Sequence, residues 1–162
     1  MPRLAPDQVE GEVLVVVPAL LSDRETALDM ARRLSVLRLA NPESRLSYML
    51  LGDFQDGPAA VEPEDGGVTE AALSAVRALN EVWNGGFYYL HRQRAWNERA
   101  ERYMGRERKR GALESLNRAL LDGVFPDELA AASDAPETLR GRFATVITPV
   151  SYTHLRAHET RR

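Results

Sequence analysis

The sequence predicts an α/β fold with a mostly parallel sheet covered by helices. Short apolar runs rich in β-branched residues recur along the chain, as in strands that are buried on both faces of a parallel sheet. Longer segments with apolar residues at helical spacing lie between these runs. The resulting order of strand, helix, strand, helix, strand, helix and strand predicts right-handed crossovers between parallel strands.

The first strand and helix are predicted near the N-terminus. Residues 12–18, EVLVVVP, form a continuous apolar run that indicates a buried strand. Ser22, with Glu25 three residues later, has the pattern of a capping box and predicts a helix over 22–39. An Asn-Pro pair then ends the helical pattern, because the residue before a proline disfavours helical geometry.

The second strand and helix follow. Residues 46–51 predict a strand that runs into the turn-rich segment 52–58, GDFQDGP. The acidic, Pro/Gly-rich stretch 57–67 predicts an exposed connection. Thr69 is the expected cap of a helix over 69–83. The residues expected on the buried face of that helix are Leu73, Val76, Leu79 and Val82 or Trp83.

The second half of the chain completes the alternation. A third strand is predicted at 87–91, a basic loop at 91–105 and a helix at 106–121 that ends at a glycine. Residues 124–140 are expected to form a loop or short helical pieces, and a fourth strand is predicted at 143–148. The expected buried stripe of the third helix consists of Ala112, Leu113, Leu116, Ala119 and Leu120.

Composition narrows the class of protein. With 162 residues, 44% of them hydrophobic and 28% charged, the chain can form one globular domain with a real core. No apolar run approaches the roughly 18 residues of a membrane span, and the N-terminus lacks an apolar signal region. The absence of cysteine excludes disulfides and zinc–thiolate sites, which fits a reducing compartment.

Positive charge is concentrated in one segment. Residues 91–110 contain eight Lys/Arg and three Glu, a local charge of +5, so the net charge of −3 leaves −8 for the rest of the chain. Arg106, Arg108, Lys109 and Arg110 open the third helix, where the partial positive charge of the helix terminus makes cations unfavourable unless an anion binds. Free N–H groups and cations together favour a polyphosphate, and a solvated basic loop is the alternative. Neither GxxxxGK[ST] nor GxGxxG occurs, which argues against ATPases and dinucleotide-binding enzymes.

Polar side chains gather at the predicted strand ends. Asp53 and Asp56 follow the second strand, and His91 and Arg92 follow the third. Ligands of open parallel sheets bind at the carboxyl ends of the strands, so we expect a site there.

Four segments resemble the glycosyltransferase domain of cyclic β-1,2-glucan synthases. The likeness covers about residues 12–148, and the most specific part is ERKRG followed by an LxxLN helix. These synthases are large bacterial membrane enzymes, and their transferase module has the Rossmann-like GT-A fold. The matching segments are VLVVVPALLS (13–22), LLGDFQD (50–56), FYYLHRQRAWN (87–97) and MGRERKRGALESLNRALLDG (104–123).

This resemblance implies a UDP-glucose donor, a β-glucan acceptor and no nucleic acid. Pro18 and Ala19 would contact the nucleotide through their backbones, and Asp53 would hydrogen-bond the uracil or ribose. Lys109 and Arg110 would approach the diphosphate. Transfer would take place on the cytoplasmic face of the bacterial inner membrane, where parts outside this chain anchor the enzyme and the chain itself is soluble.

Other residues keep two interpretations. Asp56 either helps to bind the nucleotide or forms a turn. Two carboxylates also occur in glycoside hydrolases, where they flank the sugar from two sides, but Asp53 and Asp56 share one tight loop and do not suit that arrangement. Trp96 either stacks on a sugar or base or anchors the basic loop as a buried residue. His91 is expected to be structural rather than catalytic. Asn117 either bonds back to the loop or lies half-exposed on its helix.

The C-terminal end departs from the family. After the fourth strand the family continues into an Asp-x-Asp motif that holds Mg²⁺ or Mn²⁺. Residues 149–162 instead resemble a translated adapter or vector artefact, in which the spacing of His154, His158 and Glu159 mimics a metal site that lacks further ligands. We therefore expect a lead-in over 1–11, the N-terminal part of a GT-A domain over 12–148 and a non-native tail. Such a chain would carry the donor-binding half of the enzyme and would not transfer glucose.

Two other functions remain open. Residues 91–110 have the composition of a basic nucleic-acid-binding module, in which Trp96 and Tyr103 lie between arginines. A non-catalytic α/β interaction domain is the second alternative. Salt-dependent binding to single strands without competition by UDP would favour the first, and melting that UDP does not affect would favour the second.

Overall fold

The structure is a computed structural model that describes residues 11–149. Most of the expected lead-in and the expected tail from residue 150 onward, including His154, His158 and Glu159, lie outside the described part. The elements in chain order are β1 (Val13–Leu21), α1 (Arg24–Ala40), β2 (Leu46–Phe54), α2 (Asp65–Trp83), β3 (Phe87–Arg92), β4 (Ala95–Asn97), β5 (Arg102–Met104), α3 (Arg108–Asp122), β6 (Leu129–Ala132), η2 (Pro136–Leu139) and β7 (Thr145–Ile147).

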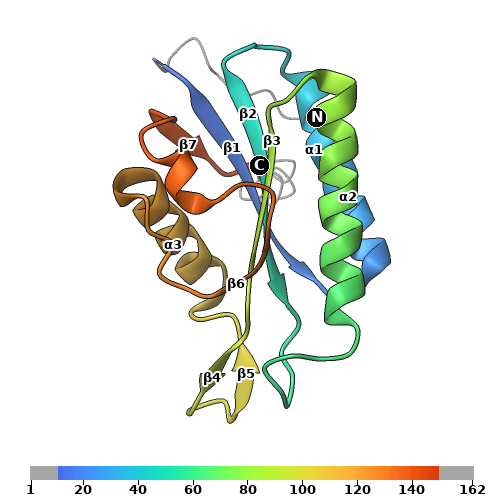
Figure 1. The fold of residues 1–162 in the computed structure, drawn as a ribbon, viewed down its shortest axis with the longest axis vertical. Coiled ribbons are helices and arrows are strands. Elements are labelled where there is room, and N and C mark those ends of the chain that lie inside the picture. The colour runs from blue at the N-terminus through green and yellow to red at the C-terminus, as the bar shows by residue number, and fades with distance from the viewer. Residues whose placement is uncertain (1–10, 150–162) are drawn as a thin grey trace, which may run out of the picture.

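One twisted sheet lies between two layers of helices (Figure 1). Its strand order is β6-β3-β2-β1-β7, in which β7, β1, β2 and β3 are parallel and β6 is antiparallel to β3. Helices α1 and α2 cover one face and α3 covers the other. The predicted α/β fold with a mostly parallel sheet is therefore confirmed.

Strand β1 shows why its apolar run is continuous. Val13, Val15 and Val17 pack in the core beneath α1 and α2, whereas Leu14 and Val16 pack in the core beneath α3. Because successive side chains of a strand point to opposite faces, a strand between two helical layers must be apolar at every position.

Strands β1 and β2 each end three residues later than predicted, at Leu21 and Phe54. All nine residues of β1 pair in register with β2, so Gly52 and Asp53 belong to the strand rather than to the expected turn. Pro18 lies within β1, beyond the part that β7 pairs with, where its missing N–H group is tolerated.

Both N-terminal helices begin differently from the prediction. Asp23, not Ser22, caps α1, and its carboxylate accepts a hydrogen bond from the Thr26 N–H at 2.7 Å. Helix α2 begins four residues before Thr69, so Thr69 is not its cap; the Thr69 hydroxyl instead donates to the Asp65 carbonyl. On the predicted face of α2, Val76 is buried, Leu73, Leu79 and Trp83 pack against the core, and Val82 is exposed.

The second half of the chain differs from the prediction in its strands. The expected loop 91–105 contains the β4–β5 hairpin. The segment 124–140, which was expected to form a loop or short helical pieces, contains the short helix η2 in agreement with that prediction and also the unpredicted strand β6. Strand β7 is shorter than predicted. Helix α3 buries the predicted stripe, with Leu113 half-buried, and ends at Gly123 in the left-handed conformation with φ 77°. None of the helices in the described residues is long and apolar enough to cross a membrane.

Candidate functional site

A small pocket opens at the carboxyl ends of β1 and β2, where the sequence predicted a site. Its volume is about 140 Å³, and the start of α3 forms its other wall. The residues that line it are Ala19, Leu20, Asp53, Phe54, Asp56, Gly105, Arg108 and Lys109.

Arg92 organises the polar groups beneath this pocket. Its side chain is 1% exposed and forms two parallel hydrogen bonds to Asp53, Nε to Oδ1 at 2.7 Å and Nη2 to Oδ2 at 2.8 Å. It also donates to Asp127 at 3.0 Å and to the carbonyls of Arg106 and Arg108, both at 2.9 Å. This buried cation is therefore fully hydrogen-bonded, and it joins β2, β3 and the start of α3.

The chain itself shields Arg92 and most of Asp53 from water, while the Asp53 side chain stays 12% exposed at the pocket. Burial raises the pKa of the Asp53 carboxyl, and the hydrogen bonds from Arg92 offset only part of that rise. Burial lowers the pKa of Arg92, but Asp53 and Asp127 raise it by more. Gly105 passes directly over the pair, since a Cβ atom there would lie 2.8 Å from Arg92 Nη2 and 2.9 Å from Asp53 Cγ.

The backbone at the start of α3 is strained. Glu107 and Arg108 both have φ 52°, a left-handed conformation that costs non-glycine residues about 1–3 kcal/mol. No side chain caps the helix. Gly111 permits the close approach of the Arg106 carbonyl, because a Cβ atom at this position would lie 1.9 Å from that oxygen. The hydrogen bonds from Arg92 to two carbonyls of this segment hold it in place.

Most of the cations at the start of α3 are neutralised within the chain. Their ion pairs are Arg106 with Asp127 and Glu107, Arg108 with Asp56, and Arg110 with Glu107 and Glu114. Lys109 lines the pocket, and its side chain has no ion pair or hydrogen bond among residues 11–149. A lone ammonium beside an uncapped helix N-terminus is suited to an anionic group.

The structure brings four of the six predicted site residues to this pocket: Ala19, Asp53, Asp56 and Lys109. Pro18 is buried in β1 and does not line it. The Arg110 side chain is 73% exposed and pairs with acidic residues of its own helix. In the sequence, Arg92 stands at a predicted strand end without an assigned role, because no local pattern shows that its partner is Asp53.

A second arginine of the predicted basic loop is also buried. Arg94 pairs with Asp65, Nη1 to Oδ2 at 2.7 Å, donates to the Gln55 carbonyl at 2.6 Å and lies 4.7 Å from the centre of the Phe54 ring. It lines a polar hollow of about 320 Å³ that shares Phe54 and Asp56 with the pocket. The two hollows therefore adjoin along the carboxyl ends of the strands.

The remaining candidates lie outside the pocket. His91 is completely buried, with Nδ1 2.7 Å from the Tyr89 hydroxyl, which agrees with a structural role. Trp96 is 52% exposed, so its interpretation as a buried anchor is wrong. Asn117 lies on the exposed side of α3, in a groove between α3 and β7, where Phe143 also lines the wall.

The described residues offer no obvious metal site. Residues 11–149 contain no group of three or more His, Asp or Glu side chains placed to hold an ion. Asp53 and Asp56 form ion pairs with Arg92 and Arg108, respectively. The carboxylates at the pocket therefore do not fit a divalent cation in this arrangement.

The chain is similar in sequence to a known glucan synthase. No protein-family model matches the chain. Over 132 residues, 79% of the chain, it is 36% identical to the cyclic beta-(1,2)-glucan synthase NdvB of Rhizobium meliloti (strain 1021). The chain spans 5% of the length of that relative. The similarity relates most of this chain to one small region of the synthase, and the resemblance noted in the sequence is confirmed to that extent.

Proposed function

We propose that this chain is the donor-binding part of a UDP-glucose-dependent glucosyltransferase of the GT-A type that makes β-1,2-glucan. The similarity to a glucan synthase supports the class of enzyme. The observation that carries the assignment to the donor is Lys109, which has no ionic partner in the described chain and lines a pocket at an uncapped helix N-terminus.

Each group at the pocket has a role in this proposal. Lys109 and the N–H groups that open α3 bind the diphosphate, and the backbone of Ala19 lies against the nucleoside. Pro18, which the resemblance also assigned to the nucleotide, is buried and has no direct contact in this proposal. Asp53 accepts a hydrogen bond from the uracil or ribose. A carboxylate has about four acceptor positions and Arg92 occupies two of them, so Asp53 can hold its ion pair and a ligand together.

The rest of the reaction belongs to the longer enzyme. We expect Mg²⁺ or Mn²⁺ there, where the ion supplies positive charge to the leaving diphosphate. The acceptor is a β-glucan, and the membrane is reached through other parts of that enzyme, on its cytoplasmic face.

Calorimetric titration of the chain with UDP and UDP-glucose tests the donor site. Lys109→Ala should weaken binding by about 1.5–3 kcal/mol, the contribution of one charge-assisted contact. Arg118→Ala is the matched control, because it removes one charge from the same helix, where Arg118 pairs with Asp122 away from the pocket. Equal affinities of the wild type and Lys109→Ala would refute the proposal.

The UDP affinity of Arg110→Ala distinguishes the role that the resemblance gives Arg110 from the position that the structure gives its side chain. The resemblance assigns Arg110 to the diphosphate together with Lys109, whereas the structure places its side chain with Glu107 and Glu114. We expect its removal to weaken UDP binding less than the removal of Lys109. A larger loss for Arg110→Ala would show that this side chain leaves its acidic partners when the donor binds.

A further inference from the structure

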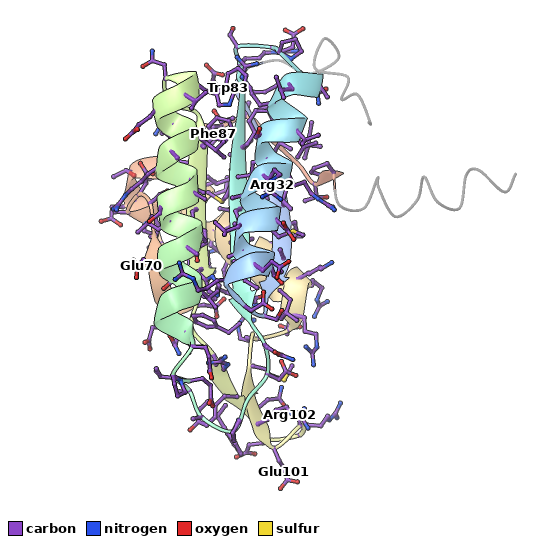
Figure 2. All side chains as sticks on the ribbon, turned by 90° about the vertical axis from the view of Figure 1, so that its right-hand side faces the viewer. Arg32, Glu70, Trp83, Phe87, Glu101 and Arg102 are labelled. Carbon is purple, nitrogen blue, oxygen red and sulfur yellow. The ribbon has the colours of Figure 1, made fainter. Side chains whose placement is uncertain are left out.

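The β4–β5 hairpin projects beyond the sheet at the end where the pocket opens. Figure 1 shows it past the carboxyl ends of β2 and β3, and Figure 2 shows Glu101 and Arg102 at its tip. A two-stranded hairpin alone is marginally stable in water, so its position depends on contacts with the rest of the chain.

Those contacts fix the hairpin to the rim of the pocket. Tyr103 and Gly57 exchange two backbone hydrogen bonds, of 2.9 and 3.0 Å. Gly57 follows the pocket residue Asp56, and Gly105, which also lines the pocket, follows the last residue of β5. In the turn of the hairpin, the Ala100 N–H donates to the Asn97 side chain at 2.8 Å. The hairpin is therefore pre-organised beside the pocket.

An aromatic pair stands on this hairpin. Trp96 lies directly across from Tyr103 in the register, and the ring centres are 5.2 Å apart at an angle of 64°. Trp96 is the one aromatic side chain of residues 11–149 that is exposed. Tyr103 covers only part of it, so a ligand that covers the remaining ring surface removes apolar area from water.

The charge of the hairpin favours a neutral ligand. Residues 95–104 contain two Arg and two Glu, so this segment has no net charge. Arg92 and Arg94, which make the surrounding sequence basic, are buried in ion pairs with Asp53 and Asp65. The local surface thus lacks the excess of free cations that a nucleic acid backbone requires.

We propose that Trp96 and Tyr103 form a sugar-binding platform that holds the acceptor glucan at the rim of the donor pocket. Sugar rings are uncharged, present C–H faces that stack on aromatic rings and have hydroxyls that bond to neighbouring charged groups. The identity of the sugar as an acceptor rests on the function proposed above. The proposal that a sugar ring stacks on Trp96 depends only on the geometry of the hairpin.

The fluorescence of Trp96 reports directly on this platform. The chain has two tryptophans. Trp83 lies near the opposite end of the molecule, where the Arg38 guanidinium is 4.6 Å from its ring centre (Figure 2). Trp83→Phe therefore leaves Trp96 as the single reporter. On titration with linear β-1,2-linked glucose oligosaccharides, we expect a blue shift of its emission and protection from acrylamide quenching.

Calorimetry with the same oligosaccharides measures the contribution of the ring. Trp96→Ala should weaken binding by about threefold to tenfold, the range of an aromatic contact, whereas Trp96→Phe should retain most of the affinity. The side chain is half in solvent, so both variants should melt at the temperature of the wild type. Equal oligosaccharide affinity of the wild type and Trp96→Ala would overturn the proposal.

The remaining outcomes separate this site from the donor site. If the oligosaccharide protects Trp96 from quenching and UDP does not bind, the platform is supported and the donor proposal is refuted. UDP binding that depends on Lys109, without any oligosaccharide binding, overturns the platform and leaves the donor site intact. Protection of Trp96 by a single-stranded oligonucleotide but not by the sugar would overturn it in favour of a nucleic-acid surface.

Discussion

His91→Gln should make the stability of this chain less sensitive to acid. His91 is completely buried, and Nδ1 is 2.7 Å from the Tyr89 hydroxyl. Gly52 makes room for the ring, because a Cβ atom there would lie 2.5 Å from Nδ1. Nε2 has no hydrogen-bond partner among the described residues, so a positive charge on the ring would be unsatisfied.

The environment of the ring sets the size of the effect. Burial is the main cause that lowers the pKa of His91 from 6.5 to about 3; Arg94 and Arg92 lower it further and Asp65 opposes them. Since the folded pKa is depressed, the stabilising contribution of neutral His91 is complete above pH 6.5 and is lost as the pH falls toward 3. Between about pH 7.5 and about pH 5 the loss amounts to about 2 kcal/mol, which is a large part of a typical domain stability of about 5–15 kcal/mol.

Urea unfolding at these two pH values measures the difference. The reference protein carries His154→Gln and His158→Gln, which leaves His91 as its only histidine. We expect this protein to lose about 2 kcal/mol more than its His91→Gln variant. Burial raises the pKa of Asp53, which acts in the opposite direction, but that carboxyl is present in both proteins and cancels in the comparison. An equal loss in both proteins would refute the reasoning, even if His91→Gln lowers stability at every pH.

Two substitutions test how the start of α3 is held. Arg92→Met leaves Asp53 and Asp127 without their shared cation, and we expect urea unfolding to show a loss of about 3–5 kcal/mol. Gly111→Ala forces a Cβ atom to within 1.9 Å of the Arg106 carbonyl, so the segment must move; we expect a loss of about 1–3 kcal/mol in urea and faster amide exchange at the start of α3.

One matched change on an exposed surface is the control for Arg92→Met. Arg118→Met removes an arginine that forms an exposed ion pair with Asp122, so it should change stability by less than about 0.5 kcal/mol. An Arg92→Met protein as stable as Arg118→Met would show that the buried ion pair is not needed to hold the site. A Gly111→Ala protein with unchanged amide exchange would show that the carbonyl can move away without cost.

The local pattern of apolar residues was sufficient to predict the layered arrangement of this fold. Alternating apolar runs and helical repeats predicted a mostly parallel sheet, and the stripe of α3 and its stop at Gly123 are confirmed. These signals are local, since the side-chain period of a strand or helix depends only on neighbouring residues. The position of the pocket at the strand ends followed from the order of the elements.

Element boundaries depended on partners that are distant in the sequence. Strand β2 continues through Asp53 because β1 pairs with it residue for residue. Helix α2 starts at Asp65, whose carboxylate binds Arg94, 29 residues away in the chain. A sequence window that contains only one member of such a pair cannot show where the element begins or ends.

Contacts between residues that are distant in the sequence also determine which side chains form the site. Arg92 and Asp53 are 39 residues apart, and only the pairing of β2 with β3 brings them together in a buried ion pair. Along RERKR every residue is charged, so the sequence alone does not distinguish the cations. Successive residues of a helix point about 100° apart, and α3 therefore turns Lys109 to the pocket and Arg110 to the acidic residues of its own helix.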